Sequence, residues 1–165
     1  MKKYELTGET KEVYGHVLHR IRALREFGDF RKGTLGGWVE RERNLSQTGN
    51  AWVSDNAEVY GDAKVYGNAW VYDNAKVSDN AEVYGDAKVY GNAWVYDNAK
   101  VSDNAEVSGN ALVYGNAWVY GDATVCGDAK VYDNAWISGN AWISGNATVC
   151  GNAEVWLRGS RRRRG

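Results

Sequence analysis

The feature that most constrains this chain is a six-residue phrase, repeated eighteen times between residues 50 and 157 without insertion or deletion. The phrase reads Asn/Asp, Ala, any residue, Val/Ile, Tyr/Ser, Gly/Asp, with few substitutions. Alanine falls at Ala51 and at every sixth residue to Ala153, and Val or Ile follows two places later, from Val53 to Val155. A fixed period of this kind predicts a repeat protein in which each unit packs against its neighbours.

The hexad predicts a short strand followed by a corner. Side chains alternate along a strand, so Ala and the Val two places later point to one side and the residue between them to the other. Gly, Asp and Asn then turn the corner because they tolerate left-handed backbone angles. Coils stacked about 4.8 Å apart would bury rings of Val and Ala, with Asn/Asp side chains forming ladders at the corners.

The pattern Val-x-x-x-Ala-x, as in Val71 to Lys76, resembles the hexapeptide repeat of the left-handed β-helix family. The resemblance covers about two thirds of the chain and implies triangular coils of three hexads each. We therefore expect an all-β, left-handed triangular parallel β-helix of about six regular coils with an N-terminal β-hairpin cap. The family often has a small or acidic residue where this chain has Tyr or Ser after Val.

A second period runs through the repeat, because residues 54–77 and 78–101 are identical. Twenty-four residues are four hexads, one more than a triangular coil holds. Copies of one outward residue, such as Trp70 and Trp94, are then expected on different faces, so the sequence gives no sign of one specialised flat face. A four-sided coil of 24 residues is the alternative.

The chain divides into an N-terminal β cap (residues 1–32), a hexapeptide-repeat β-helix (33–157) and a basic tail (158–165). In the cap we expect a hairpin, although residues 16–25 also fit a helical stripe. Residues 33–49 are interpreted as a degenerate first coil, with Leu35 eighteen residues before Val53 and Leu45 in the Ala position. Trp38 and Phe30 are expected to plug the open end.

The head carries a second resemblance, in Gly36-Gly37-Trp38-Val39 and in Asn44-Leu45-Ser46-Gln47 just before the repeats. These features are similar to those of a YdcK-like group of bacterial and phage hexapeptide-repeat proteins. The group is labelled transferase-like on the strength of its repeats.

Composition and charge exclude several classes of protein. No apolar run is long enough for a membrane span, and the charged N-terminus lacks the apolar core of a signal peptide. We therefore expect a cytoplasmic protein of bacterial or viral origin, with no membrane partner. The net charge of −1 hides ten Lys/Arg against seven Asp/Glu in residues 1–48, and five against fourteen in residues 49–157.

The sequence argues against catalysis. Hexapeptide acyltransferases use a coil His and an extruded loop, whereas His16 and His19 here lie in the head and no loop interrupts the coils. Two His cannot supply the three zinc ligands of the γ-type carbonic anhydrases. Cys126 and Cys150 occupy outward positions on neighbouring faces, too far apart for a disulfide. We expect no enzyme activity, no catalytic residue, no metal and no cofactor.

Outward aromatic residues are the remaining candidates for a site. Rings on a flat sheet can stack on sugars, but cross-strand aromatic ladders also stabilise sheets, and the second interpretation is favoured. The candidate ligand-stacking residues are Trp52, Trp70, Trp94, Trp118, Trp136 and Trp142.

The tail carries Arg158 and Arg161 to Arg164. Without aromatics or a groove, these residues are weak evidence for nucleic-acid binding, which we disfavour. We interpret them instead as charges that oppose end-to-end stacking of rods. Self-association through solenoid faces or ends is the partner interaction that we expect. The first hypothesis for function is a non-enzymatic structural or scaffold β-solenoid. The alternatives are a carbohydrate-binding module using outward Trp and Tyr, and a degenerate acyltransferase relative.

Overall fold

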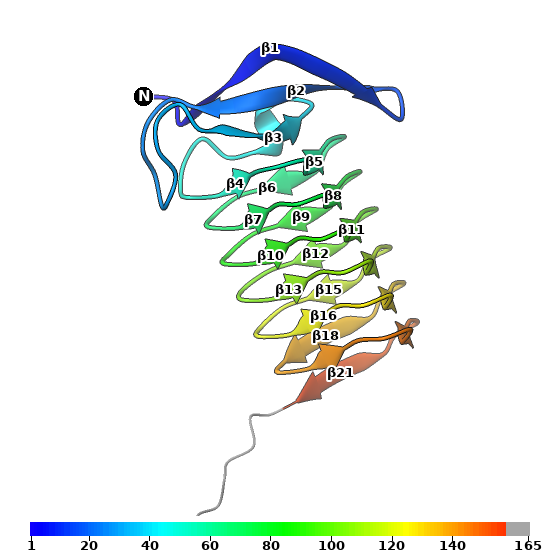
Figure 1. Ribbon diagram of the computed structural model, residues 1–165. Helices are drawn as coiled ribbons and strands as arrows, with labels where there is room; N and C mark the ends of the chain where they lie inside the picture. The colour runs from blue at the N-terminus through cyan, green and yellow to red at the C-terminus, as the bar shows by residue number, and fades with distance from the viewer. Residues whose placement is uncertain (158–165) are drawn as a thin grey trace, which may run out of the picture.

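The computed structural model describes residues 1–157 as a β-solenoid beneath an antiparallel head (Figure 1). The expected arginine tail, residues 158–165, lies outside the described residues. Among the described residues there is no α-helix, and the single helical element is the 3-10 turn η1 (Glu42–Asn44). No described helix is long and apolar enough to cross a membrane.

Three sheets form the faces of the solenoid, and the coil strands in each are parallel. The first face continues from the head, in the order β1-β2-β3-β5-β8-β11-β14-β17-β20. Its head strands are β1 (Tyr4–Val13), β2 (His16–Ala23) and β3 (Leu35–Val39). Its repeat strands are β5 (Glu58–Val59), β8 (Lys76–Val77), β11 (Trp94–Val95), β14 (Leu112–Val113), β17 (Lys130–Val131) and β20 (Thr148–Val149).

The other two faces contain repeat strands only, six in each. The second face contains β4 (Trp52–Val53), β7 (Trp70–Val71), β10 (Lys88–Val89), β13 (Glu106–Val107), β16 (Thr124–Val125) and β19 (Trp142–Ile143). The third face contains β6 (Lys64–Val65), β9 (Glu82–Val83), β12 (Lys100–Val101), β15 (Trp118–Val119), β18 (Trp136–Gly139) and β21 (Glu154–Leu157).

The register is eighteen residues per coil, so the triangular expectation is confirmed and the four-sided alternative is wrong. Val71 lies opposite Val53 on one side and Val89 on the other. Every Ala and Val of the repeat from Ala51 to Ile137 is buried, and together they form one continuous core along the axis. The alternation of side chains in each two-residue strand puts these two positions inside the coil.

The corners use the conformations that their residues allow. The residue before each Asn/Asp has a positive φ, near 55–59° where it is Asp, as at Asp73 and Asp97, and near 61–70° where it is Gly. The Asn side chains form the expected ladders, such as the one in which Asn80 donates to Asn98 and Asn98 to Asn116, at 3.2 and 3.3 Å. Asp carboxylates at the same corners accept backbone N–H groups one coil on, as Asp73 does from Gly91.

The first coil is irregular, and its register differs from the one expected. Val39 lies opposite Val59 and Leu45 opposite Val65, which is twenty residues rather than eighteen. Leu45 therefore occupies a Val position instead of the Ala position. Leu35 is half exposed and pairs with Arg22 of the hairpin instead of preceding Val53 by one coil. The two additional residues lie between Leu45 and Gly49. Gly49 already lies against Gly67, eighteen residues further along the chain, as in a regular coil.

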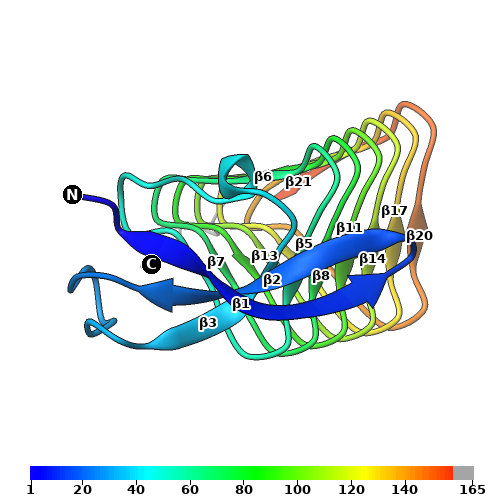
Figure 2. The same ribbon diagram turned by 90° about the horizontal axis from the view of Figure 1, so that it is seen from above.

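The hairpin forms as expected, and residues 16–23 are a strand. Seen from above, β1, β2 and β3 cross the end of the coils (Figure 2). Tyr4 and Ile21 are fully buried against the first Val residues of the core, and the Tyr4 hydroxyl donates to the carbonyl of Leu45 at 2.6 Å. The end is therefore closed by the hairpin itself.

The expectation that Trp38 and Phe30 plug the open end of the coils is wrong. Trp38 lies opposite Glu58, an outward position, and packs with Leu18 and Tyr60 in a separate cluster beneath the hairpin. Phe30 packs against Trp52 and Trp70 on the outside of the second face. Trp38 lies on the outer surface because the pleat of β3 directs it away from the interior, and Phe30 reaches the outer surface from the loop between β2 and β3.

The last described residues extend the third face. Trp156 lies opposite Ser138 and Leu157 opposite Gly139, and both are more than half exposed. They continue β21 in register with β18.

Candidate functional site

The outward Trp residues are divided among all three faces, as the 24-residue period predicts. Successive copies step one face round the solenoid, because each is four hexads from the last and a coil holds three. Trp94 lies on the first face. Trp52, Trp70 and Trp142 lie on the second, and Trp118 and Trp136 on the third. The structure therefore does not bring the six candidates together into one platform.

The Tyr residues that follow Val form ladders along the corners. Their rings stack face to face between successive coils at 4.8–4.9 Å, with interplanar angles of 7° or less. That spacing is the separation of hydrogen-bonded strands, so one residue per coil places the rings in contact automatically. The ladders are Tyr66–Tyr84, Tyr72–Tyr90 and Tyr96–Tyr114–Tyr132.

At Ser54, Ser78 and Ser102, which take the place of Tyr in such a column, a Trp from the next coil fills the space. The indole N–H of Trp70 donates to the Ser54 hydroxyl at 2.8 Å, and its ring packs on Tyr72 at 4.5 Å. Trp94 bonds to Ser78 and Trp118 to Ser102 in the same way, and Trp142 lies 3.2 Å from the sulfur of Cys126. The offset is sixteen residues each time. This Ser-to-Trp spacing is a signal in the sequence that identifies these contacts.

Two of the candidate residues lack this partner. Trp52 is fully buried beneath the head, in edge contact with Tyr4 and Phe27, so the structure leaves it no open face for a ligand. Trp136 is 44% exposed and has Tyr120 at the position sixteen residues before it. Among the candidates in the described part of the chain, Trp136 is therefore the one that does not bond to a Ser or Cys and is not covered by the head.

Glutamates occupy the same diagonal position relative to some tyrosines. The Tyr66 hydroxyl donates to Glu82 at 2.9 Å, and the Tyr90 hydroxyl to Glu106 at 3.0 Å, again sixteen residues apart. Burial, followed by the bond to Glu82, raises the pKa of Tyr66, and burial raises the pKa of Tyr72 to about 12. Tyr66 and Tyr72 therefore remain protonated and neutral throughout the physiological range.

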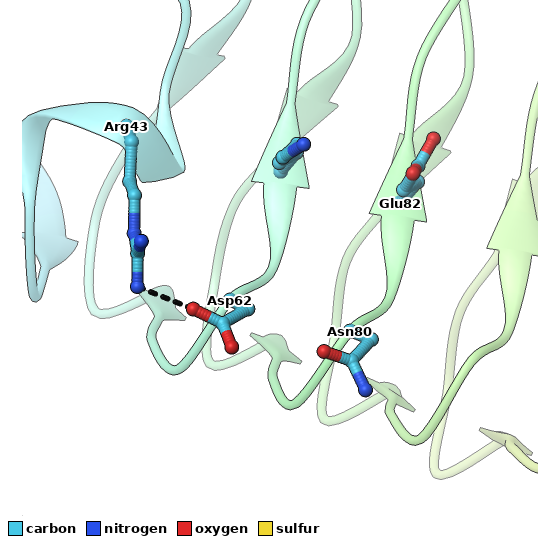
Figure 3. A pocket seen from close by; sticks show the side chains of 5 residues that line it. Arg43, Asp62, Asn80 and Glu82 are labelled. Atoms are coloured by element: carbon cyan, nitrogen blue, oxygen red, sulfur yellow. Dashed lines mark hydrogen bonds and ion pairs between the residues drawn. The ribbon is translucent and has the colours of Figure 1, made fainter.

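An open polar hollow of about 420 Å³ lies beside the third face next to the head (Figure 3). It is lined by Arg43, Asp62, Lys64, Asn80 and Glu82. Arg43 forms an ion pair with Asp62, and Lys64 lies opposite Glu82 on the neighbouring strand. The lining charges are balanced, so the hollow offers no net attraction for an ionic ligand.

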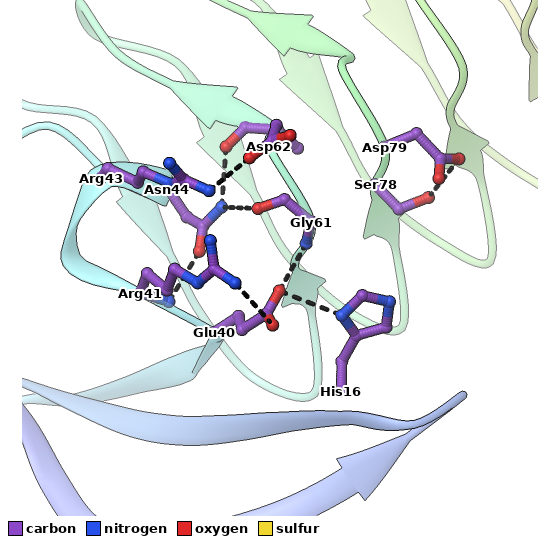
Figure 4. A network of polar contacts seen from close by, with 10 residues as sticks. His16, Glu40, Arg41, Arg43, Asn44, Gly61, Asp62, Ser78 and Asp79 are labelled. Atoms are coloured by element: carbon purple, nitrogen blue, oxygen red, sulfur yellow. Dashed lines mark hydrogen bonds and ion pairs between the residues drawn. The ribbon is translucent and has the colours of Figure 1, made fainter.

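The two histidines do not share a site. His16 Nδ1 lies 3.1 Å from Glu40 Oε2, and the same oxygen accepts the Gly61 N–H at 2.7 Å (Figure 4). Burial alone would raise the pKa of Glu40, but the Gly61 amide and His16 lower it overall. His19 lies further along β2, opposite Val39. We interpret the His16–Glu40 pair as a tie that fixes the hairpin to the first regular corner.

The two cysteines do not pair with each other. Cys126 and Cys150 are free thiols, the first half-buried and the second exposed. Within residues 1–157, no group of three or more His, Cys, Asp or Glu residues is arranged to hold a metal ion.

Comparison with known proteins relates the coils to one group. A family model described as "YdcK Beta solenoid repeat" matches residues 105–121. A protein of Escherichia coli (strain K12), named "Uncharacterized acetyltransferase YdcK", is 42% identical over 52 residues. That stretch covers 32% of this chain and 15% of the Escherichia coli protein, so the similarity concerns a minor part of the relative.

Proposed function

We propose that this chain, a YdcK-like β-solenoid repeat protein, functions as a structural scaffold and not as an enzyme. One observation carries the proposal: with few exceptions, the outward aromatic side chains stack on one another or donate a hydrogen bond to a neighbouring Ser, Cys or Glu. Tyr rings use their faces in the ladders, and four Trp residues direct their indole N–H to a Ser or Cys of the preceding coil. Such residues stabilise the faces that carry them.

The acyltransferase alternative is suggested by the name of the relative and by the fold. The described residues offer it little support. The solenoid core is filled by Val and Ala, the hollow on the third face has balanced charges, and His16 is engaged with Glu40. A carboxylate can orient a general base, so the His16–Glu40 pair is the element of this alternative that a variant can test.

The test uses acetyl-CoA as the probe, first as a ligand and then as an acyl donor. We expect the melting temperature of the wild-type chain to stay unchanged with millimolar acetyl-CoA, because a ligand stabilises only a folded state that binds it. We also expect no release of free CoA with a panel of amine and hydroxyl acceptors. Stabilisation by several degrees together with acetyl transfer that is lost in His16→Asn would overturn the proposal.

A further inference from the structure

Trp136 departs from the repeat in a way that points to a ligand. The same slot in the preceding copies holds Lys64, Lys88 and Leu112, whereas Trp70, Trp94, Trp118 and Trp142 occupy a slot paired with Ser or Cys. Trp136 lies in β18, between β15 and β21, so described strands border it on both sides. Its exposure is therefore a property of this face. Trp142 differs in this respect, since the residue one coil beyond it, residue 160, lies outside the described residues.

The rings around Trp136 form an angled cluster in place of a ladder. Its ring centroid lies 6.0 Å from that of Trp118 at 75° and 6.4 Å from that of Tyr120 at 81°. Neither contact is a face-to-face stack of the kind that occupies the Tyr rings elsewhere. The residue two places on is Ser138, smaller than the Tyr that follows most other outward Trp residues. Trp136 keeps exposed ring surface for these reasons.

Polar side chains border the cluster. Glu154 is the partner of Trp136 on the next strand, and Ser138 follows it on its own strand. On the other side, the ammonium of Lys100 lies 5.9 Å from the Trp118 ring. An aromatic surface surrounded by hydrogen-bonding groups matches a pyranose ring, which has C–H groups on its face and hydroxyls on its rim. We infer that Trp136, with Trp118 and Tyr120, is a stacking site for a neutral pyranose sugar, a binding function beyond the proposed scaffold role.

Other occupants fit these observations less well. Trp136 is 44% exposed, and Trp156 and Leu157 on the adjoining strand are 56% and 58% exposed. At about 250 Å² or less for each side chain, the three together offer less than the roughly 800 Å² per partner that a stable protein interface takes. Residues 49–157 carry five Lys against fourteen Asp/Glu, and Glu154 is a direct neighbour of the ring. That charge repels the phosphates from which most nucleic-acid affinity comes.

The repeat suggests variants that should remove the sugar site and one that should add a second copy of it. Trp136→Lys and Trp136→Leu restore residues that the repeat itself holds in this slot, so both are expected to fold. Lys88 on the second face has Trp70, Tyr72 and Glu106 around it, as Trp136 has Trp118, Tyr120 and Glu154. Lys88→Trp with Tyr90→Ser would therefore copy the cluster to a second place.

The probe is an array of neutral oligosaccharides of glucose, galactose, mannose and N-acetylglucosamine, followed by calorimetric titration of the strongest binder. We expect wild-type binding at one site per chain, a loss of at least about tenfold in affinity in both Trp136 variants, and two sites in the Lys88/Tyr90 variant. Melting curves of all variants report whether each is folded. Absence of binding to any neutral sugar, or equal binding by wild type and a folded Trp136 variant, would overturn the inference. Selective binding of acidic glycans or nucleic acid would do so too. None of these outcomes bears on the acetyl-CoA test of the scaffold proposal.

Discussion

Trp52 and Trp70 occupy the same slot of the hexad, lie opposite each other on neighbouring strands, and have different surroundings. Trp52 is fully buried under Tyr4, Phe27 and Phe30 of the head, and its indole N–H has no hydrogen-bond partner. Trp70 is half-buried and bonds to Ser54 of the coil above. The comparison shows that the hexad sets the direction of a side chain, while the head decides whether that direction leads to solvent.

The same contrast holds for polar residues. In the head, Asn44 is fully buried and donates to the carbonyls of Gly61 and Ala63. In the coils, exposed Asn98 is one rung of a ladder that repeats every eighteen residues. Each contact in the head is made once, whereas each contact of the coils recurs in several coils. A substitution should therefore lower the stability of the protein more in the head than in the coils, provided that the register of the coils is kept.

The largest effect is expected from breaking the register. Deleting residues 78–101 removes one complete copy of four hexads, so every inward Ala and Val still meets a residue of its own kind one coil away, and a shorter folded protein should result. Deleting residues 79–81 moves Ala and Val out of the inward positions and should unfold the solenoid beyond that point. Circular dichroism melting of both proteins decides the matter, and equal melting temperatures would contradict the interpretation of the repeat.

Replacing Trp52 and Trp70 by Ala, one at a time, should destabilise the protein to different extents, because the head covers Trp52 and not Trp70. We expect Trp52→Ala to lower the free energy of unfolding by about 3–5 kcal/mol, because it leaves a cavity under the head. Trp70→Ala should cost about 1–2 kcal/mol, since its side chain is already partly hydrated. Urea denaturation measures both. Equal losses would show that the head contributes no more to burial of this slot than a regular coil does.

Alkaline pH should act on the two regions with opposite sign. Burial, and then the charge of Arg25, lower the pKa of Lys3 in the head to about 8. Between pH 8 and the unfolded value near 10.5 the unfolded chain binds more protons, so this group makes stability rise with pH. Burial raises the pKa of Tyr60 and Tyr72 to about 12, so above pH 10 the unfolded chain loses protons first and stability falls.

Urea denaturation at pH 7, 9.5 and 11.5 would show the rise and the fall. Lys3→Met should abolish the rise and leave the fall, whereas Tyr72→Phe should reduce the fall only. If the stability of Lys3→Met stays flat from pH 9.5 to pH 11.5, the tyrosines are not buried as the structure has them.

The smallest effect is expected at the Asn ladder. Asn98→Ala removes one exposed rung and should cost about 1 kcal/mol or less, because water can replace its bonds. Asn44→Ala should cost about 2–3 kcal/mol, since it leaves buried backbone groups of η1 and of the first corner without partners. Thermal melting of the pair, read against wild type, gives both values. A greater loss at Asn98 would reverse the contrast between head and coil.

By itself, the sequence determined the regular part of this protein. A six-residue period with Ala and Val two places apart dictates inward positions, corners and an eighteen-residue coil, because side-chain alternation and parallel pairing leave few other ways to bury that pattern. The split of Trp70 and Trp94 between faces followed from the 24-residue identity. The Ser-to-Trp offset was also within reach, since it recurs at Ser54, Ser78 and Ser102.

Only the tertiary structure decided the irregular part. The twenty-residue first coil, the outward packing of Trp38 and Phe30, and the burial of Trp52 depend on how the hairpin and the loop that follows it lie across the coils. Those contacts join residues far apart in sequence that obey no period, so local propensity cannot specify them. The exposure of Trp136 has the same origin, because it depends on Tyr120 and Trp118, one coil away.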